Sequence, residues 1–202
     1  MKKLVIYIHG RGGGAAEAAR YQPLFPDADV IGFAYQAQNP WEAAEEFPRF
    51  VDTYRQFYDA VWLIANSIGA FFALSALDQK RIDRAFLISP VVDMERLIGD
   101  MMCWADVSEE KLQEQREITT DFGETLSWDY LCYVRSHPIG WDVPTCILYG
   151  EKDHLTSWET ISAFAEKHTA PLTVMPGGEH WFHTEEQMCF LDDWLKNAAK
   201  IV

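Results

Sequence analysis

The 202-residue sequence contains no long hydrophobic run and has few basic residues. Its apolar runs are much shorter than the ~20 residues that cross a membrane. The start, MKKLVIYIHG, also has too little apolar length for a secretory signal. The 17 Lys and Arg residues against 31 Asp and Glu residues give a net charge of −14, which would repel nucleic-acid phosphates and anionic membranes. We therefore expect a cytoplasmic protein whose partner is neither nucleic acid nor membrane.

Cysteine is also sparse, and the motifs of common cofactor sites are missing. The four cysteines, which are Cys103, Cys132, Cys146 and Cys189, are widely spaced and include no C-x-x-C pair. They are predicted to be buried or idle thiols, not a disulfide framework or a zinc site. No two histidines have the H-x-x-x-H spacing of a helical metal site, and no Gly-Lys-Ser/Thr sequence marks a P-loop. We predict no metal and no cofactor.

The sequence does contain a regular alternation of apolar runs and helical patterns. The runs that predict strands are 3–9, 29–35, 59–67, 84–90, 144–150 and 171–178. The patterns that predict helices are 39–58, 68–77, 156–168 and 184–200, and Pro48 is expected to kink or shorten the first. This alternation predicts a single α/β domain over 1–202, with a mostly parallel sheet of about six strands and helices on both faces. Functional residues of such sheets lie at the carboxyl ends of the strands.

Residues 91–142 interrupt the alternation and are predicted to be a helical cap or lid inserted in the domain. The helical patterns within them are 94–105, 108–119 and 127–136. Residues 93–142 contain twelve acidic and four basic side chains, which favours a neutral or cationic small substrate. Trp104, Trp128 and Tyr130 are candidates to bind its acyl group. The alternative is that these aromatic side chains pack the insertion onto the rest of the domain.

Ser67 lies in the segment ANSIGA (65–70), between the most apolar strand and a helical pattern. A serine at a sharp strand-to-helix turn needs small neighbours, because its backbone is strained there. Ala65 and Gly69 are small enough, although the usual pattern, G-x-S-x-G, has glycine at both positions. The turn would project the Ser67 hydroxyl above the sheet and aim the N-terminus of the helix at a developing oxyanion. A serine that merely caps a helix is the alternative.

Two later segments offer the partners that a nucleophilic serine needs. Asp153 follows the strand at 144–150, and His180 follows the strand at 171–178. All three side chains are therefore expected along one edge of the sheet. His183 is an alternative base, and Asp93 is an alternative acid.

The glycine-rich segment GRGGGA (10–15) also matches the G-x-G-x-x-A pattern of a dinucleotide site. That site requires an acidic residue at the end of the second strand to bind the ribose. The second strand ends in GFAYQ (32–36), which has no carboxylate, and Asp29 lies at its start. The pattern therefore disfavours nucleotide binding.

The order Ser67, Asp153, His180 and the motifs HGRGG (9–13), NSIGA (66–70), GEKD (150–153) and GGEHWF (177–182) resemble the α/β-hydrolase superfamily. The resemblance extends over essentially the whole chain. It implies that Ser67 is the nucleophile, His180 the general base and Asp153 the carboxylate that orients it. It also implies an oxyanion hole formed by the amides of Arg11 and Ile68, with Gly12 as an alternative to Arg11.

These features predict a serine hydrolase that cleaves a carboxylic ester, or a related acyl bond, through an acyl-enzyme. One alternative is an aminopeptidase-like amidase with the same three residues. Another is a catalytically silent binding protein with the same fold. Turnover of aminoacyl arylamides would favour the amidase, and a missing triad member would favour the binding protein. The sequence does not fix the oligomeric state.

Overall fold

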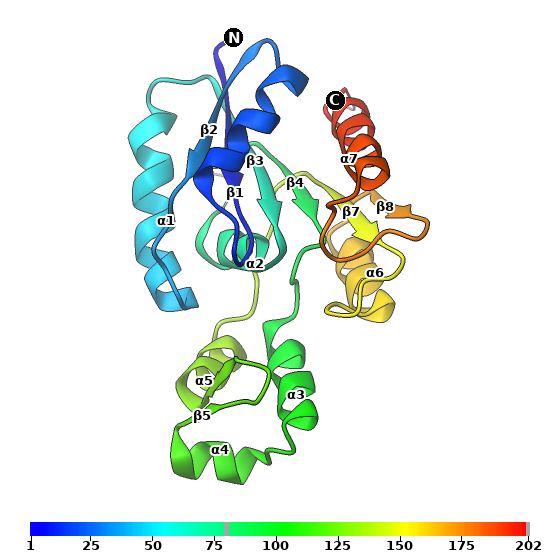
Figure 1. The fold of residues 1–202 in the computed structure, drawn as a ribbon. Coiled ribbons are helices and arrows are strands. Elements are labelled where there is room, and N and C mark those ends of the chain that lie inside the picture. Colours follow the sequence, from blue (N-terminus) through cyan, green and yellow to red (C-terminus); the bar gives the residue numbers. More distant parts are fainter. Residues whose placement is uncertain (79–80, 201–202) are drawn as a thin grey trace. The chain divides into compact units, whose positions relative to one another are not determined.

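The computed structural model describes residues 1–78 and 81–200, which divide into two compact units. The first unit comprises Met1–Val92 and Gly140–Val202, and the second comprises Asp93–Ile139. Figure 1 labels their helices and strands.

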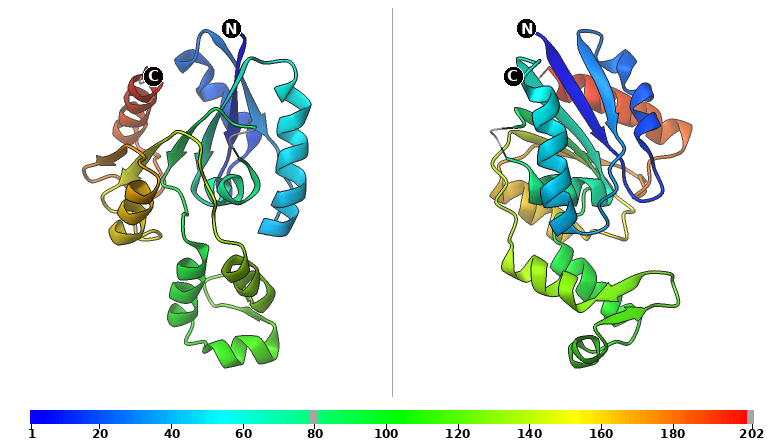
Figure 2. Two further views of the ribbon diagram at one scale, coloured as in Figure 1. Left: turned by 180° about the vertical axis from the view of Figure 1, so that it is seen from behind. Right: turned by 90° about the vertical axis from the view of Figure 1, so that its left-hand side faces the viewer.

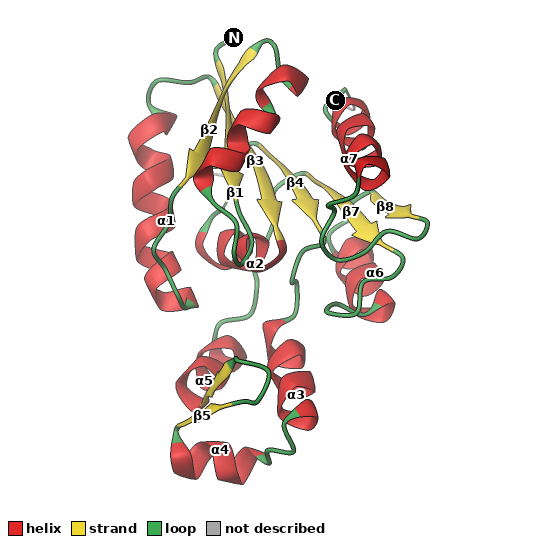
Figure 3. Cartoon of the chain, in the orientation of Figure 1, coloured by secondary structure: helices red, strands yellow, loops and turns green. Residues whose placement is uncertain are grey.

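Within the described residues, six parallel strands form the sheet of the first unit, in the order β2-β1-β3-β4-β7-β8 (Figure 3). Each of the six apolar runs forms one of these strands, so the predicted parallel sheet is confirmed. The strands are β1 (Lys3–Ile8), β2 (Ala28–Phe33), β3 (Ala60–Asn66), β4 (Arg84–Ile88), β7 (Thr145–Gly150) and β8 (Leu172–Met175).

Helices cover both faces of this sheet, as predicted. They are the α-helices α1 (Pro40–Arg55), α2 (Ser67–Ala76), α6 (Trp158–Lys167) and α7 (Glu185–Ala198) and the 3-10 helices η1 (Ala15–Arg20) and η2 (Gln22–Leu24). The two 3-10 helices were not predicted. Helix α1 continues through Pro48 and ends at Arg55, three residues before the predicted end. Asn39 starts this helix, because its side chain accepts a hydrogen bond from the Glu42 amide.

The chain changes face at β1 and β3, which are neighbours in the sheet. After β1 it continues into η1, whose Ala18 packs in one cluster with Tyr7 of β1 and Trp194 of α7. After β3 it continues into α2, which packs against α1 on the other face (Figure 2). Loops that leave neighbouring strand ends toward opposite faces open a crevice between them, where α/β proteins bind ligands. The crevice here lies beside Ser67.

The second unit contains three helices, as predicted, and a β-hairpin that was not predicted. The helices are α3 (Met94–Trp104), α4 (Glu109–Gln115) and α5 (Trp128–Ser136), and the hairpin strands are β5 (Glu117–Thr119) and β6 (Thr125–Ser127). The predicted helix 108–119 is therefore too long. It ends early because Arg116 adopts a φ of +68°, which a right-handed helix cannot continue through.

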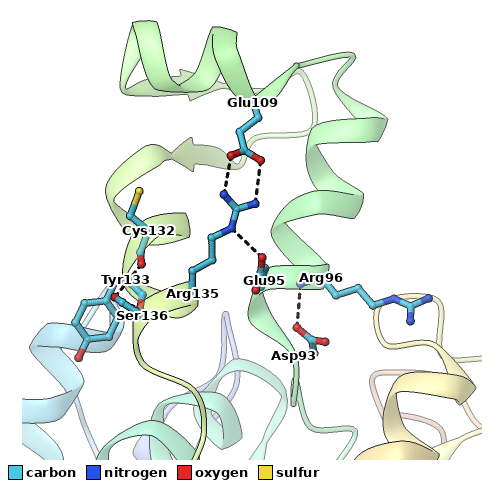
Figure 4. A network of polar contacts seen from close by, with 8 residues as sticks. All are labelled: Asp93, Glu95, Arg96, Glu109, Cys132, Tyr133, Arg135 and Ser136. Carbon is cyan, nitrogen blue, oxygen red and sulfur yellow. Dashed lines mark hydrogen bonds and ion pairs between the residues drawn. The ribbon is translucent and has the colours of Figure 1, made fainter.

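Arg135 of α5 links all three helices of the second unit (Figure 4). Its Nη1 and Nη2 atoms donate to the two carboxylate oxygens of Glu109 at 2.6 and 2.9 Å, and its Nε donates to Glu95 at 2.8 Å. The paired Arg–carboxylate geometry fixes direction as well as distance. It holds the pKa of Glu109 below its ordinary value, mainly through the Arg135 hydrogen bonds.

Two features bear on the expectations about thiols and membranes. All four cysteines are free thiols; Cys146 is buried, and the other three are exposed. Among residues 1–78 and 81–200, no helix combines the length and the apolar character needed to cross a bilayer.

Candidate active site

Ser67 lies at the tight turn between β3 and α2. Its φ of +49° is in the left-handed region, which costs free energy for a residue with a side chain. Gly69 permits this turn to lie directly against the loop after β1. A Cβ atom on Gly69 would lie 2.2 Å from the backbone oxygen of His9, far inside a van der Waals contact. Close packing against this loop therefore requires glycine at position 69 of the motif.

Ser67, His180 and Asp153 form a continuous chain of hydrogen bonds. The Oγ atom of Ser67 lies 2.8 Å from Nε2 of His180, and Nδ1 of His180 lies 2.7 Å from Oδ2 of Asp153. The Asp153 carboxylate can only accept, so Nδ1 is assigned as the donor. Nε2 is then left to accept the proton of Ser67. The structure thus brings together the three side chains that the sequence placed after three separate strands.

Asp153 is held rigidly at the end of β7. Its side chain is fully buried, and its second oxygen, Oδ1, accepts hydrogen bonds from the amides of Leu155 at 2.8 Å and Thr156 at 3.1 Å. The loop after β8, which carries His180, crosses close to the end of this strand. A Cβ atom on Gly150 would lie 2.5 Å from the backbone oxygen of Glu179, so glycine allows the approach.

The alternative base and acid have other contacts. Nδ1 of His183 lies 2.7 Å from the Trp181 backbone oxygen and 3.5 Å from a Glu179 carboxylate oxygen. Asp93 lies in the second unit and caps α3, accepting a hydrogen bond from the Arg96 amide at 2.9 Å. The hydrogen-bond geometry therefore favours His180 as base and Asp153 as acid.

The two residues expected to form the oxyanion hole lie beside Ser67. Ile68 is in the first turn of α2, where backbone amides have no acceptor within the helix. Arg11 is in the loop after β1, and a Cβ atom on the preceding Gly10 would lie 3.2 Å from the Cβ atom of Ser67. Tyr35 steadies this loop: its hydroxyl donates to the His9 backbone oxygen at 2.9 Å, and its ring stacks on the imidazole.

A cavity of about 730 Å³ opens beside Ser67 and His180, entirely within the first unit. Arg11, Glu17 and Arg20 supply charged groups to its wall. Much of its apolar lining comes from the loop after β8 and from α7, and includes Trp181, Phe182, Met188 and Leu191. The cavity is large enough for a small organic substrate.

Sequence reasoning did not identify a network behind this cavity. The Tyr7 hydroxyl donates to Glu17 at 2.5 Å and accepts a hydrogen bond from the side chain of Asn66 at 3.3 Å. The one available signal was a tyrosine in an otherwise aliphatic strand, KLVIYI. Tyrosine is common in strands, so that signal alone would not have pointed to the site.

The predicted acyl-binding residues Trp104, Trp128 and Tyr130 all lie in the second unit. Trp104 is 57% exposed and meets Phe122 edge to face, whereas Trp128 and Tyr130 are half-buried. Burial raises the pKa of Tyr130. Their role in substrate binding stays a prediction, as does the role of residues 91–142 as a lid.

In residues 1–78 and 81–200, no three His, Cys, Asp or Glu side chains are grouped as metal ligands would be.

Comparison with solved structures places the fold. Est1E from Butyrivibrio proteoclasticus superimposes with a TM-score of 0.77 at 16% identity, over 98% of this chain and 86% of its own. Mouse alpha/beta hydrolase domain-containing protein 10 gives a TM-score of 0.78 at 13% identity, over 97% and 89%. An alpha-beta serine hydrolase homologue from Coxiella burnetii gives 0.62 at 14% identity, over 97% and 84%.

No family model and no curated protein matches the sequence. At these identities the likeness concerns the fold. The chain has the α/β-hydrolase fold, as the sequence motifs implied.

Proposed function

We propose that this protein is a serine hydrolase that cleaves a carboxylic ester of a small substrate through an acyl-enzyme intermediate. The observation that carries the proposal is the chain of hydrogen bonds from Ser67 through His180 to Asp153, at the edge of a cavity. Structures with the same fold include esterases and hydrolases, which agrees with it.

In the first half of the reaction, Ser67 Oγ attacks the ester carbonyl carbon while Nε2 of His180 takes the hydroxyl proton. Asp153 keeps the imidazole in the required tautomer and stabilises the imidazolium that forms. The carbonyl oxygen becomes an oxyanion, and the amides of Arg11 and Ile68 donate to it. Each such donor contributes on the order of 3 kcal/mol to the transition state.

His180 then gives its proton to the leaving alcohol, and the acyl group remains on Ser67. In the second half, water attacks the acyl-enzyme while His180 takes a proton from it. The tetrahedral intermediate then collapses, His180 returns this proton to Ser67 Oγ, and the carboxylic acid is released. The His180 side chain is 25% exposed, which leaves a path for this water.

The cavity suggests which acyl groups to test first. Its apolar lining includes Trp181, which is 73% exposed, stacked on the ring of His183. Exposed aromatic rings at a cavity favour planar or aromatic ligands. A structure of Est1E contains bound ferulic acid, an aromatic acid. We propose neutral or cationic aromatic and short alkyl esters as the substrate class, with the second unit contributing to its selection.

The test is the hydrolysis of p-nitrophenyl esters followed by stopped flow. An acyl-enzyme predicts a burst of p-nitrophenol whose amplitude matches the enzyme concentration. Ser67→Ala should abolish the burst and lower kcat by about 10⁶-fold. Ser75→Ala is the matched control, since Ser75 lies in the same helix and its hydroxyl donates to the Phe71 backbone oxygen at 2.8 Å. Equal activity of Ser67→Ala and Ser75→Ala would contradict the proposal.

A further inference from the structure

The Tyr7 hydroxyl is an unexpected polar group in the middle of the sheet. Tyr7 is completely buried in β1, and its ring packs in an apolar cluster with Ile64, Phe86 and Leu148. A phenylalanine would fill almost the same volume without a polar atom to satisfy. Burying a hydroxyl costs free energy unless it finds hydrogen-bond partners. The partners of this hydroxyl therefore indicate what it does.

Those partners form one continuous chain of hydrogen bonds. The amide of Gly14 donates to Oε1 of Glu17 at 2.9 Å, and the Tyr7 hydroxyl donates to Oε2 of the same carboxylate at 2.5 Å. The Asn66 side-chain amide donates to the Tyr7 oxygen at 3.3 Å. Hydrogen bonds to a carboxylate are shorter and stronger than those between neutral groups. This chain of hydrogen bonds thus runs from Gly14 through Glu17 and Tyr7 to Asn66.

The two ends of this chain lie on the two segments that carry the oxyanion donors. Gly14 belongs to the loop after β1, which contains Arg11, and Asn66 directly precedes Ser67 and Ile68. The two segments belong to different strands and turn toward opposite faces of the sheet. Their separation is therefore not fixed by one element alone.

We propose that Tyr7 and Glu17 are positioning residues that hold these two segments at the separation the oxyanion requires. The proposal rests on the serine-hydrolase function proposed above. Oxyanion donors act only when both lie within hydrogen-bond distance of the same oxygen atom. Through Gly14, Glu17 fixes the loop that carries Arg11. Through Asn66, Tyr7 fixes the turn that carries Ser67 and Ile68.

The protonation state of Tyr7 suits this role. Burial raises the pKa of Tyr7, and its hydrogen bond to Glu17 acts in the same direction. The phenol therefore keeps its proton and remains a donor to the carboxylate over the whole pH range in which the protein would work.

A purely structural role makes a different prediction. Glu17 also helps to start η1, because Gly14 is the residue that precedes that helix. Loss of the network would then lower stability, but the folded fraction would keep its kcat. A positioning role predicts that kcat falls in the folded protein while KM changes little, because the oxyanion hole stabilises the transition state and not the bound ester.

The experiment compares Tyr7→Phe, Glu17→Ala and Glu17→Gln with Tyr58→Phe. Tyr58 is the matched control, since its hydroxyl also donates to a carboxylate, that of Asp29 at 2.7 Å. Asp29 lies near the amino end of β2, whereas Ser67 follows the carboxyl end of β3. Each variant is measured for its unfolding midpoint, kcat, KM and inhibition by a trifluoromethyl ketone, which forms a tetrahedral oxyanion adduct on a nucleophilic serine.

We expect Tyr7→Phe and Glu17→Ala to lower kcat about tenfold, less than the ~10²-fold loss of a whole oxyanion donor. The inhibition constant of the ketone should rise by the same factor, with KM little changed. Glu17→Gln keeps an acceptor oxygen and should restore part of the loss. Tyr58→Phe should match the wild type.

If kcat and the ketone inhibition constant of the folded Tyr7 and Glu17 variants match those of Tyr58→Phe, the positioning role is wrong, even where their unfolding midpoints fall. Glu17 is exposed, so its two variants give this answer if Tyr7→Phe does not fold. A wild type that neither hydrolyses esters nor binds the ketone would overturn the proposed function and this role with it. An active wild type with unaffected variants would overturn the role alone.

Discussion

The Ser67 hydroxyl lies 2.8 Å from Nε2 of His180, although 113 residues separate them in the chain. The parallel sheet accounts for this proximity. Ser67 follows β3 and His180 follows β8, and the carboxyl ends of parallel strands lie at one edge. Each residue reaches the site because its own strand ends there. The site is therefore sensitive to changes in the turns that follow the strands.

Replacement of Asp153 by Asn should lower kcat by about 10⁴-fold with little loss of stability. The amide nitrogen cannot accept the Nδ1 proton of His180, so the imidazole would adopt the wrong tautomer. Asp93→Asn is the control, because Asp93 caps a helix of the second unit, where its side chain accepts a hydrogen bond from the Arg96 amide. Steady-state ester hydrolysis measures both variants. Loss of kcat in Asp93→Asn, with Asp153→Asn unaffected, would exchange their assigned roles.

The two histidines of the loop after β8 should differ sharply in effect. His180→Ala should lower kcat by about 10⁵- to 10⁶-fold, since Ser67 would lose its base. His183→Ala should still form the acyl-enzyme, because its ring bonds to the Trp181 backbone oxygen. Burst kinetics with a p-nitrophenyl ester separate the two cases. A burst that survives in His180→Ala and vanishes in His183→Ala would identify His183 as the base.

Gly69→Ala and Gly99→Ala should change stability in opposite directions. At Gly69 the new methyl group would meet the His9 backbone oxygen at 2.2 Å, so the loop must move. We expect a loss of roughly 1–3 kcal/mol and a lower kcat. Among the described residues, a methyl group at Gly99, in helix α3, would meet no heavy atom within 4 Å apart from its chain neighbours and its own helix backbone, so alanine should add about 1 kcal/mol through helix propensity. Urea unfolding gives both values, and a stabilised Gly69→Ala would contradict the close packing.

Tyr35 should make the stability of the protein fall as the pH becomes alkaline. Burial raises the pKa of Tyr35 to about 12, whereas an unfolded tyrosine titrates near pH 10. The unfolded chain therefore releases this proton first, and the contribution of Tyr35 to stability is lost as the pH rises from about 10 through about 12. The urea midpoint of the wild type should fall more steeply over this range than that of Tyr35→Phe. Equal slopes would show that the Tyr35 hydroxyl titrates normally.

The aromatic residues of the second unit provide a test of the predicted lid. If Trp128 selects the acyl group, Trp128→Ala should lower kcat/KM for aryl and long alkyl esters while leaving acetate esters unchanged. The expected loss for a large acyl group is 10- to 200-fold, about 1–3 kcal/mol. A chain-length series of p-nitrophenyl esters measures this. A uniform change across the series would assign Trp128 to packing.

The sequence was a good guide to the sheet and a weaker guide to its connections. All six strands were predictable as apolar runs, and β1, β3 and β7 are buried along most of their length, as strands covered on both faces must be. The β5–β6 hairpin was missed, because the sequence EEKLQEQREIT predicts a continuous helix. Helix α4 instead ends before Arg116, which has a positive φ, a conformation that no local residue type demands.

The candidate site was also predictable only in part. Ser67, Asp153 and His180 were predictable because each lies in a short motif directly after a strand. The link from Gly14 through Glu17 and Tyr7 to Asn66 was not predictable. Tyr7 and Asn66 are 59 residues apart, and their contact depends on the pairing of β1 with β3 in this register. Such contacts arise from tertiary packing, which leaves no periodic signal in the sequence.

Covalent labelling is the decisive test of the proposal that Ser67 is a nucleophile activated by His180. The protein is treated with a fluorophosphonate probe, and the modified peptide is identified by mass spectrometry. We expect one phosphonyl group per chain, attached to Ser67, with no labelling of Ser67→Ala and strongly reduced labelling of His180→Ala. An unlabelled wild type, or labelling that persists at another residue in Ser67→Ala, would contradict it.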